Sequence, residues 1–179
     1  MKLINWLTTN DIKIFSYVNQ SLKCRLLDFW MPIITHLGGA TFTIVLPFTL
    51  IFFVPSMKLW AIQALIALTI SHLIVRIIKK GYPRKRPYLT LPNTRTFPNP
   101  LVDYSFPSGH TTAVFSVAVA FSLNVTIASF ILMPIAMIVG FSRMYLGLHY
   151  PTDCIIGAIL GSVTALLVVY MHSLYLVTI

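Results

Sequence analysis

Long apolar stretches alternate with short polar clusters along the chain, and this pattern predicts a helical membrane protein. Runs without a charged residue extend over 29–57, 59–75, 104–142 and 154–179. A membrane-spanning helix needs about 20 mostly apolar residues, and the third run is long enough for two helices with a turn near 123–124. The pattern therefore predicts an all-α integral membrane bundle with five spans, near 38–57, 58–78, 109–124, 126–145 and 154–173.

The first part of the chain has a different pattern. Residues 3–36 mix apolar and charged side chains, and apolar positions recur at helical spacing at Ile12, Phe15, Tyr17, Val18 and Leu22. This pattern is typical of amphipathic helices that lie on a membrane surface. We predict one domain over 1–179, with interfacial helices in 1–37 and the transmembrane bundle in 38–179; a sixth span within 3–36 is the alternative.

Composition supports a membrane location. Hydrophobic residues make up 57% of the chain and charged residues 9%, against about 25% charged residues in soluble domains. The net charge of +9 could indicate a nucleic-acid partner, but most cations flank the apolar runs, where they can contact lipid headgroups. We therefore expect the bilayer and no nucleic acid as a partner, and we interpret Lys80, Arg84 and Lys85 as headgroup contacts.

Local signals mark the helix ends around a proline-rich segment. Lys79, Lys80 and Gly81 have the features of a helix C-terminus, and Ser108 is a natural N-cap for the helix that follows. The segment 80–107 between them is predicted to be a functional loop. Pro151 suits the first position of the last helix, so all the polar clusters fall at the same end of the predicted bundle.

These clusters contain the groups that phosphoryl transfer needs. Cations can bind phosphate and neutralise developing charge, one imidazole can attack phosphorus while another protonates the leaving oxygen, and a carboxylate can orient an imidazole. Simpler interpretations exist for Lys79 as a dipole partner, Ser108 as a plain cap and Asp153 as a helix-start residue. The full set comprises Lys79, Arg86, Arg143, His110, His149 and Asp153.

The same residues form three ordered motifs: K-x6-R-P at 79–87, P-S-G-H at 107–110, and S-R-x5-H-x3-D at 142–153. This set resembles the signature of the type 2 phosphatidic acid phosphatase superfamily. The resemblance implies that His149 is the nucleophile that forms a phosphohistidine, that Asp153 orients it and that His110 protonates the leaving group. The phosphate oxygens would be held by Lys79, Arg86, Ser108, Gly109 and Arg143. We expect no metal and no cofactor, because three cations and one carboxylate would repel a divalent ion.

The chemistry of the motifs suits several membrane lipids. By analogy we favour undecaprenyl pyrophosphate as the substrate, with phosphatidylglycerol phosphate or phosphatidic acid as the others. Two further hypotheses are a vanadate-dependent haloperoxidase, which shares the motifs but is soluble, and a non-catalytic protein that binds or transports lipid phosphates. The resemblance implies a bacterial cytoplasmic membrane with the active site on the extracytoplasmic side, whereas the excess of cations at that end favours the cytoplasmic side.

Overall fold

The chain is described here by a computed structural model that covers residues 2–96, 100 and 102–177. Over these residues the structure is helical and contains no strand, which confirms the predicted all-α class. The α-helices are α1 (Lys2–Ser16), α2 (Arg25–Ile34), α3 (Ala40–Phe53), α4 (Lys58–Gly81), α5 (Pro87–Thr90), α6 (Gly109–Asn124), α7 (Ser129–Tyr145) and α8 (Pro151–Val177). Short helices join them: a π-helix η1 (Tyr17–Ser21) and the 3₁₀ helices η2 (Thr35–Gly38), η3 (Pro55–Met57) and η4 (Thr126–Ala128).

Each of the five predicted spans corresponds to a helix, but the number that crosses a membrane is not confirmed as five. Among the described residues, the segments Pro55–Gly81, Thr126–Tyr145 and Pro151–Tyr175 are long and apolar enough to cross. Arg25–Gly38 and Ala40–Phe53 together could form a fourth span, bent by 55° at the break between Gly38 and Ala40. The helix α6, with 16 residues, is only about 24 Å long.

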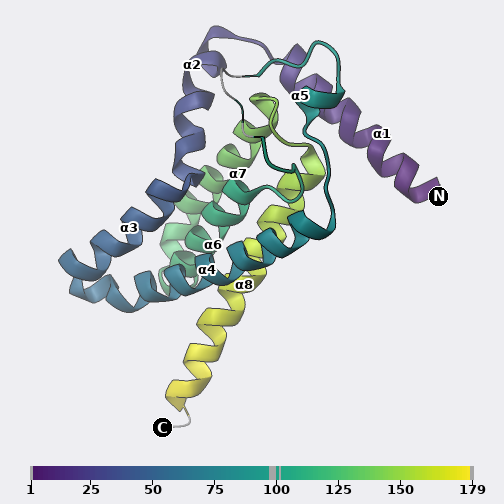
Figure 1. The fold of residues 1–179 in the computed structure, drawn as a ribbon. Coiled ribbons are helices and arrows are strands. Elements are labelled where there is room, and N and C mark those ends of the chain that lie inside the picture. Colours follow the sequence, from purple (N-terminus) through teal and green to yellow (C-terminus); the bar gives the residue numbers. More distant parts are fainter. Residues whose placement is uncertain (1, 97–99, 101, 178–179) are drawn as a thin grey trace.

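The helix α6 forms the centre of the bundle and packs against α4, α7 and α8 (Figure 1). Every residue from 111 to 121 is buried, and many of them are Ala, Ser, Thr or Val. Two glycines bring α8 close to it, since a Cβ at Gly157 would lie 2.7 Å from Ser108 O and one at Gly161 would lie 2.4 Å from Thr112 O. Small residues permit such close helix packing in membranes, and here they bring the first turns of α6 and α8 together.

The N-terminal segment packs only some of its apolar positions against the rest of the protein. Phe15 and Val18 are buried, whereas Tyr17 is 59% exposed. The buried face includes two polar residues, Asp11 and Asn19. They are buried because both make hydrogen bonds to distant parts of the chain, which an apolar periodicity cannot indicate.

Candidate active site

Four helix ends meet where the sequence predicted a site. The helix α4 ends at Gly81, α6 begins after its cap Ser108, α7 ends at Tyr145, and α8 begins at Pro151. The backbone N–H of Ser108 donates a hydrogen bond to the carbonyl oxygen of Asp153 at 3.0 Å, which joins the starts of α6 and α8. The described part of the segment between α4 and α6, which includes the short helix α5, lies over this end of the bundle (Figure 1).

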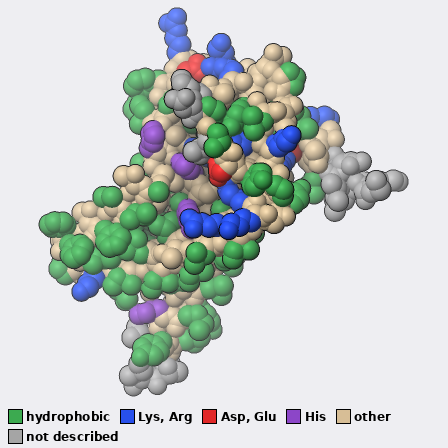
Figure 2. Space-filling model, in the orientation of Figure 1, with side chains coloured by type: hydrophobic (Ala, Val, Ile, Leu, Met, Phe, Trp, Pro, Cys, Tyr) green, Lys and Arg blue, Asp and Glu red, His purple; other side chains and the backbone are tan. Residues whose placement is uncertain are grey.

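A pocket of about 840 Å³ opens at this end and continues between α3 and α4. Five of the eight predicted site residues line it, whereas Ser108, Arg143 and Asp153 are buried and are not among its lining residues. The rest of the lining is mainly apolar and includes Ile44, Phe48, Leu65, Leu68 and Leu73. Figure 2 shows Lys, Arg, Asp and His side chains gathered around the central hollow, with hydrophobic side chains covering much of the face below it. The pocket thus joins a charged end to an apolar groove.

His149 lies on the turn before α8, with one ring nitrogen toward the pocket cations and the other toward Asp153. Arg86 Nη1 lies 3.1 Å from Nε2 of His149. Because a guanidinium can only donate hydrogen bonds, Nε2 must accept, and the ring proton of the neutral imidazole is assigned to Nδ1. Burial lowers the pKa of His149 to about 3, an effect that Asp153 opposes and Arg86 reinforces. The imidazole is therefore neutral at pH 7, with a lone pair on Nε2.

Asp153 is fully buried beside this histidine, but the contact is not a direct hydrogen bond. Its Oδ2 lies 3.6 Å from His149 Nδ1. The Ser105 hydroxyl donates a hydrogen bond to Oδ2 and lies 3.4 Å from His149 Nδ1. The backbone N–H of Tyr150 also donates to Oδ2, at 2.8 Å. Ser105 thus bridges His149 and Asp153, which sequence reasoning had paired directly.

Lys79 and Arg86 converge on one carboxylate. Asp103 accepts from Lys79 Nζ at 2.5 Å through Oδ2 and from Arg86 Nη2 at 2.5 Å through Oδ1. Burial raises the pKa of Asp103, but the two cations outweigh burial and hold that pKa below its ordinary value. The Asp103 carboxylate is therefore ionised at neutral pH, and it binds the two cations that the motifs assign to phosphate.

Arg143 lies in the last turn of α7 and is 2% exposed. Its Nη1 donates to the hydroxyl of Thr35 at 2.6 Å. Its Nε and Nη2 are buried and have no hydrogen-bond partner among the described residues. Buried donors are nearly always paired, and two adjacent free guanidinium N–H groups match two oxygens of an oxyanion. Arg143 is thus ready to bind an anion.

The P-S-G-H motif opens α6 as predicted. Ser108 Oγ accepts from Thr111 N at 3.5 Å and from Thr111 Oγ1 at 2.9 Å, so its side chain caps the helix. Gly109 and His110 follow in the first turn and line the pocket. The structure therefore places His110 and His149 on the same cavity.

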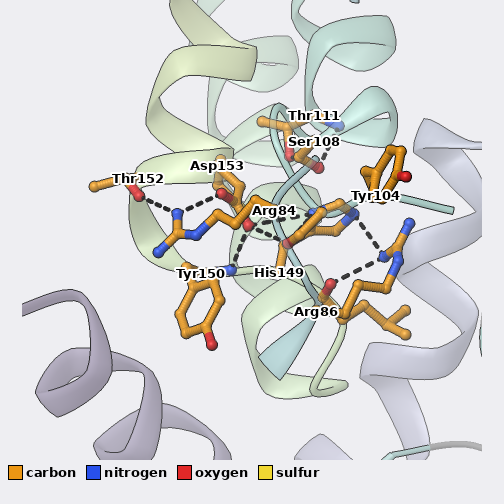
Figure 3. Close-up of polar contacts among 12 residues, drawn as sticks. Arg84, Arg86, Tyr104, Ser108, Thr111, His149, Tyr150, Thr152 and Asp153 are labelled. Carbon is orange, nitrogen blue, oxygen red and sulfur yellow. Dashed lines mark hydrogen bonds and ion pairs between the residues drawn. The ribbon is translucent and has the colours of Figure 1, made fainter. Parts of the chain in front are cut away.

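The interpretation of Arg84 as a headgroup contact was wrong. Its Nη1 donates to Asp153 Oδ1 at 2.7 Å and to Thr152 Oγ1 at 2.8 Å. Figure 3 shows its guanidinium lying between these two side chains. Its Nη2 donates to Asp11 at 2.5 Å. The run of nearby cations suggested a solvated patch because the two carboxylates that pair with Arg84 are distant in sequence.

Sequence reasoning also missed the contribution of Asp11, Asp103 and Ser105. Nothing in the local sequence of Asp103 indicated a role. Ser105 stands three residues before Ser108 in a loop without periodicity, and Asp11 lies in a segment interpreted as a surface helix. The proximity of Ser105 to the P-S-G-H motif was the one usable signal.

Comparison with known proteins agrees with the motifs. A family model described as the PAP2 superfamily matches residues 60–175, a range that contains all eight predicted site residues. The bacitracin transport permease protein BcrC of Bacillus licheniformis is 34% identical over 111 residues, which are 62% of this chain and 55% of that protein. That match thus spans about half the length of the relative.

Two further proteins match over most of this chain. An undecaprenyl-diphosphatase of Sulfolobus acidocaldarius is 29% identical over 164 residues, covering 91% of this chain and 79% of that protein. The crystal structure of a transmembrane PAP2-type phosphatidylglycerolphosphate phosphatase from Bacillus subtilis superposes with a TM-score of 0.79 at 26% identity, covering 94% of this chain and 87% of that one. The fold is therefore shared with a solved membrane protein over nearly its whole length.

Proposed function

Because this chain belongs to the PAP2 superfamily, we propose that it is an integral membrane phosphatase that hydrolyses a lipid phosphate or diphosphate without a metal. The observation that carries this proposal is Arg143, two of whose buried donors have no partner among the described residues. Arg143 interacts electrostatically with His110, which lines the pocket together with His149. A phosphate bound in the pocket would satisfy these donors. The apolar groove between α3 and α4 would hold the lipid chain beside it.

In the first chemical step, Nε2 of His149 attacks phosphorus and the bond from phosphorus to the leaving oxygen breaks. The anionic phosphate bound beside His110 favours the protonated form of its ring, and His110 then gives that proton to the leaving oxygen, so the lipid leaves as an alcohol or a monoester. The new N–P bond places positive charge on the imidazole, which ionised Asp153 stabilises through Ser105. Lys79, Arg86 and Arg143 neutralise the charge on the equatorial oxygens.

In the second step, water replaces the imidazole. His110, now neutral, accepts a proton from the water as its oxygen attacks phosphorus. The N–P bond breaks, inorganic phosphate leaves, and His149 regains its lone pair. Ser108 caps the N-terminus of α6. The N–H groups in the first turn of a helix favour an anion, so we assign Ser108 and Gly109 to the phosphate site at the start of α6.

We favour a polyprenyl diphosphate, such as undecaprenyl pyrophosphate, over a monophosphate. Arg76 and His72 lie on α4 and line the same pocket as Lys79. Residues three and four positions apart share a helix face, so these groups lie along the groove toward the lipid side. With the terminal phosphate at His149, the second phosphate would lie between the reacting atom and the lipid chain, which is the region that Arg76 faces.

For location, we propose a bacterial cytoplasmic membrane with the pocket on the extracytoplasmic side, and a single domain with residues 1–37 at that interface. Three cations at this end of the bundle are assigned to substrate binding: Lys79, Arg86 and Arg143. They therefore count less as indicators of the cytoplasmic side under the positive-inside rule. Labelling of single cysteines at Thr94 and Ser56, after replacement of Cys24 and Cys154, tests this orientation. Labelling of intact cells at Ser56 and not at Thr94 would overturn it.

The activity is tested with the full chain purified in detergent, by measuring phosphate release from a polyprenyl diphosphate in EDTA. We expect full activity in EDTA and inhibition by vanadate, whose trigonal-bipyramidal form resembles phosphorus during transfer. Activity lost in EDTA and restored by magnesium would contradict the metal-free chemistry. Lipid binding without phosphate release would favour the non-catalytic protein, and halide oxidation by peroxide with vanadate would favour the haloperoxidase.

A further inference from the structure

A buried ion network connects the first helix of the chain to Asp153. Arg84 lies between two carboxylates, donating to Asp153 Oδ1 at 2.7 Å and to Asp11 Oδ2 at 2.5 Å. Asp11 is 3% exposed, and Asp153 is fully buried. The guanidinium carbon also lies 3.9 Å from the centre of the Tyr150 ring, and Figure 3 shows Arg84 between this ring and the start of α8.

Asp11 also binds the first turn of α8. The backbone N–H of Thr152 donates to Asp11 Oδ1 at 2.9 Å, and its hydroxyl donates to Oδ2 at 2.5 Å. The N–H groups in the first turn of a helix lack partners within the helix, so the carboxylate of α1 acts as a cap for α8. Phe15 packs against Tyr150 with ring centres 5.7 Å apart, which fixes α1 beside the turn that carries His149.

These contacts complete the surroundings of the Asp153 carboxylate. Oδ2 accepts from Ser105 and from the backbone of Tyr150, while Oδ1 accepts from Arg84. Replacing a buried ion pair with apolar side chains is often neutral or stabilising, so fold stability alone gives little reason for an arginine here. Arg84 has a chemical effect, because it keeps Asp153 ionised and oriented beside His149.

We propose that Arg84 and Asp11 are positioning residues for phosphoryl transfer: Arg84 sets the charge and orientation of Asp153, and Asp11 holds Arg84 and the start of α8. Both side chains use their polar contacts on each other, on Asp153 and on Thr152, so we assign them an effect through Asp153 and not on the phosphate. This inference rests on the proposed function. It adds to the family match, because Asp11 lies outside the matched residues 60–175.

The charges around Asp153 determine the expected pH behaviour. It is faced by Arg84 from the loop, by Asp11 of α1 through Arg84, and by His149. It also interacts with Lys79 of α4, with Tyr150, and with Cys154, which in turn interacts with Arg143 of α7. Without Arg84, two buried carboxylates would share one region without their cation, so Asp153 would take up a proton at higher pH. Without the charge of Asp11, Arg84 would pair with Asp153 alone, and Asp153 would remain ionised to lower pH.

The test uses the full chain in detergent, with kcat, KM and the pH profile measured on one lipid diphosphate. We expect Arg84→Gln to lower kcat at least tenfold with KM nearly unchanged and to move the acid limb of kcat to higher pH. Asp11→Asn should lower kcat less and move that limb to lower pH or leave it in place. Arg84→Lys, which keeps the charge but cannot bridge both carboxylates as a fork, should lie between the native chain and Arg84→Gln.

The matched control is Arg95→Gln. It removes another loop arginine that pairs with a carboxylate from the first part of the chain, here Asp28 of α2 at 2.9 Å. It should leave kcat and the pH profile unchanged. Native kcat and an unmoved acid limb in Arg84→Gln would overturn the proposal, as would equal loss in all variants without a pH shift. If Arg84→Gln does not fold, Arg84→Lys and Asp11→Asn decide by the same criteria. If the native chain is inactive, that result contradicts the proposed function and not the network. The network is then tested without turnover, by measuring how the thermal stabilisation caused by vanadate changes with pH.

Discussion

Arg86 donates a hydrogen bond to Nε2 of His149 across 3.1 Å, and this contact determines which imidazole nitrogen can react. The donor occupies the lone pair that would attack phosphorus. A bound phosphate offers Arg86 better acceptors, since hydrogen bonds between ionised partners are stronger than those to a neutral ring. In the proposed mechanism, substrate binding would therefore free the lone pair of Nε2 for attack on phosphorus.

The two histidines should respond differently to the leaving group. His149→Ala removes the attacking nitrogen and should abolish turnover of every substrate. His110→Ala removes the acid. Hydrolysis should slow about 100-fold or more when the leaving group is a lipid alkoxide, and much less when it is a nitrophenolate, which needs no proton to leave. Rates for a lipid phosphate and a nitrophenyl phosphate on both variants check this assignment. Equal rescue of the two variants by the better leaving group would contradict the assignment of His149 as the nucleophile and His110 as the acid.

Arg143→Lys tests the unpaired donors of Arg143. Lysine keeps the positive charge but cannot present two parallel N–H groups, so kcat should fall by about tenfold to 100-fold while KM changes little. Arg95→Lys is the matched control, because it makes the same replacement at an arginine that does not line the pocket and pairs with Asp28 instead. Near-native turnover in Arg143→Lys would mean that Arg143 only anchors α7.

Arg76→Gln tests the preference for a diphosphate. If Arg76 stabilises the lipid-side phosphate, the variant should lose about tenfold in kcat/KM on a lipid diphosphate and little on the corresponding monophosphate, because a single charged hydrogen bond is worth about 1.5 kcal/mol or more. Both substrates should be measured with the same lipid chain. A loss of equal size on both substrates would show that Arg76 does not bind the second phosphate.

The buried His149 should make stability depend on pH. Its pKa in the folded chain is about 3, against 6.5 as the ordinary value. The unfolded chain therefore binds an extra proton between these pH values, so this contribution is complete above about pH 6.5 and falls as the pH drops, by up to about 1.4 kcal/mol per pH unit. His149→Asn should show a shallower loss of thermal stability in detergent between pH 6.5 and 4. An unchanged slope would contradict a neutral buried imidazole.

Helix ends were predictable because their signals are local. The cap at Ser108, the proline at Pro151 and the glycine at Gly81 each act within one helical turn, and the structure confirms all three. The eight motif residues could likewise be located, because they follow fixed spacings. Their grouping at one end of the bundle follows from the alternating direction of the helices.

The supporting contacts could not be predicted, because their partners are far apart. Asp11 and Thr152 are separated by 141 positions, and Arg143 and Thr35 by 108. No periodicity links such residues, and a polar side chain in a surface-like segment gives no sign that it is buried. Arg84 was misinterpreted for the same reason, since its neighbours in sequence are cations and its partners in space are carboxylates.

The hydrogen bond from Arg143 to Thr35 also connects the pocket to the shape of the membrane. Thr35 begins η2, which ends the segment Arg25–Gly38, and this segment is bent by 55° against Ala40–Phe53. Where this pair serves as one broken span, a thicker or thinner hydrocarbon layer is matched by opening or closing the bend. In the proposed mechanism, a change in this bend would shift the hydroxyl that holds Nη1 of Arg143. The thickness of the bilayer would then alter the direction in which one phosphate-binding cation points.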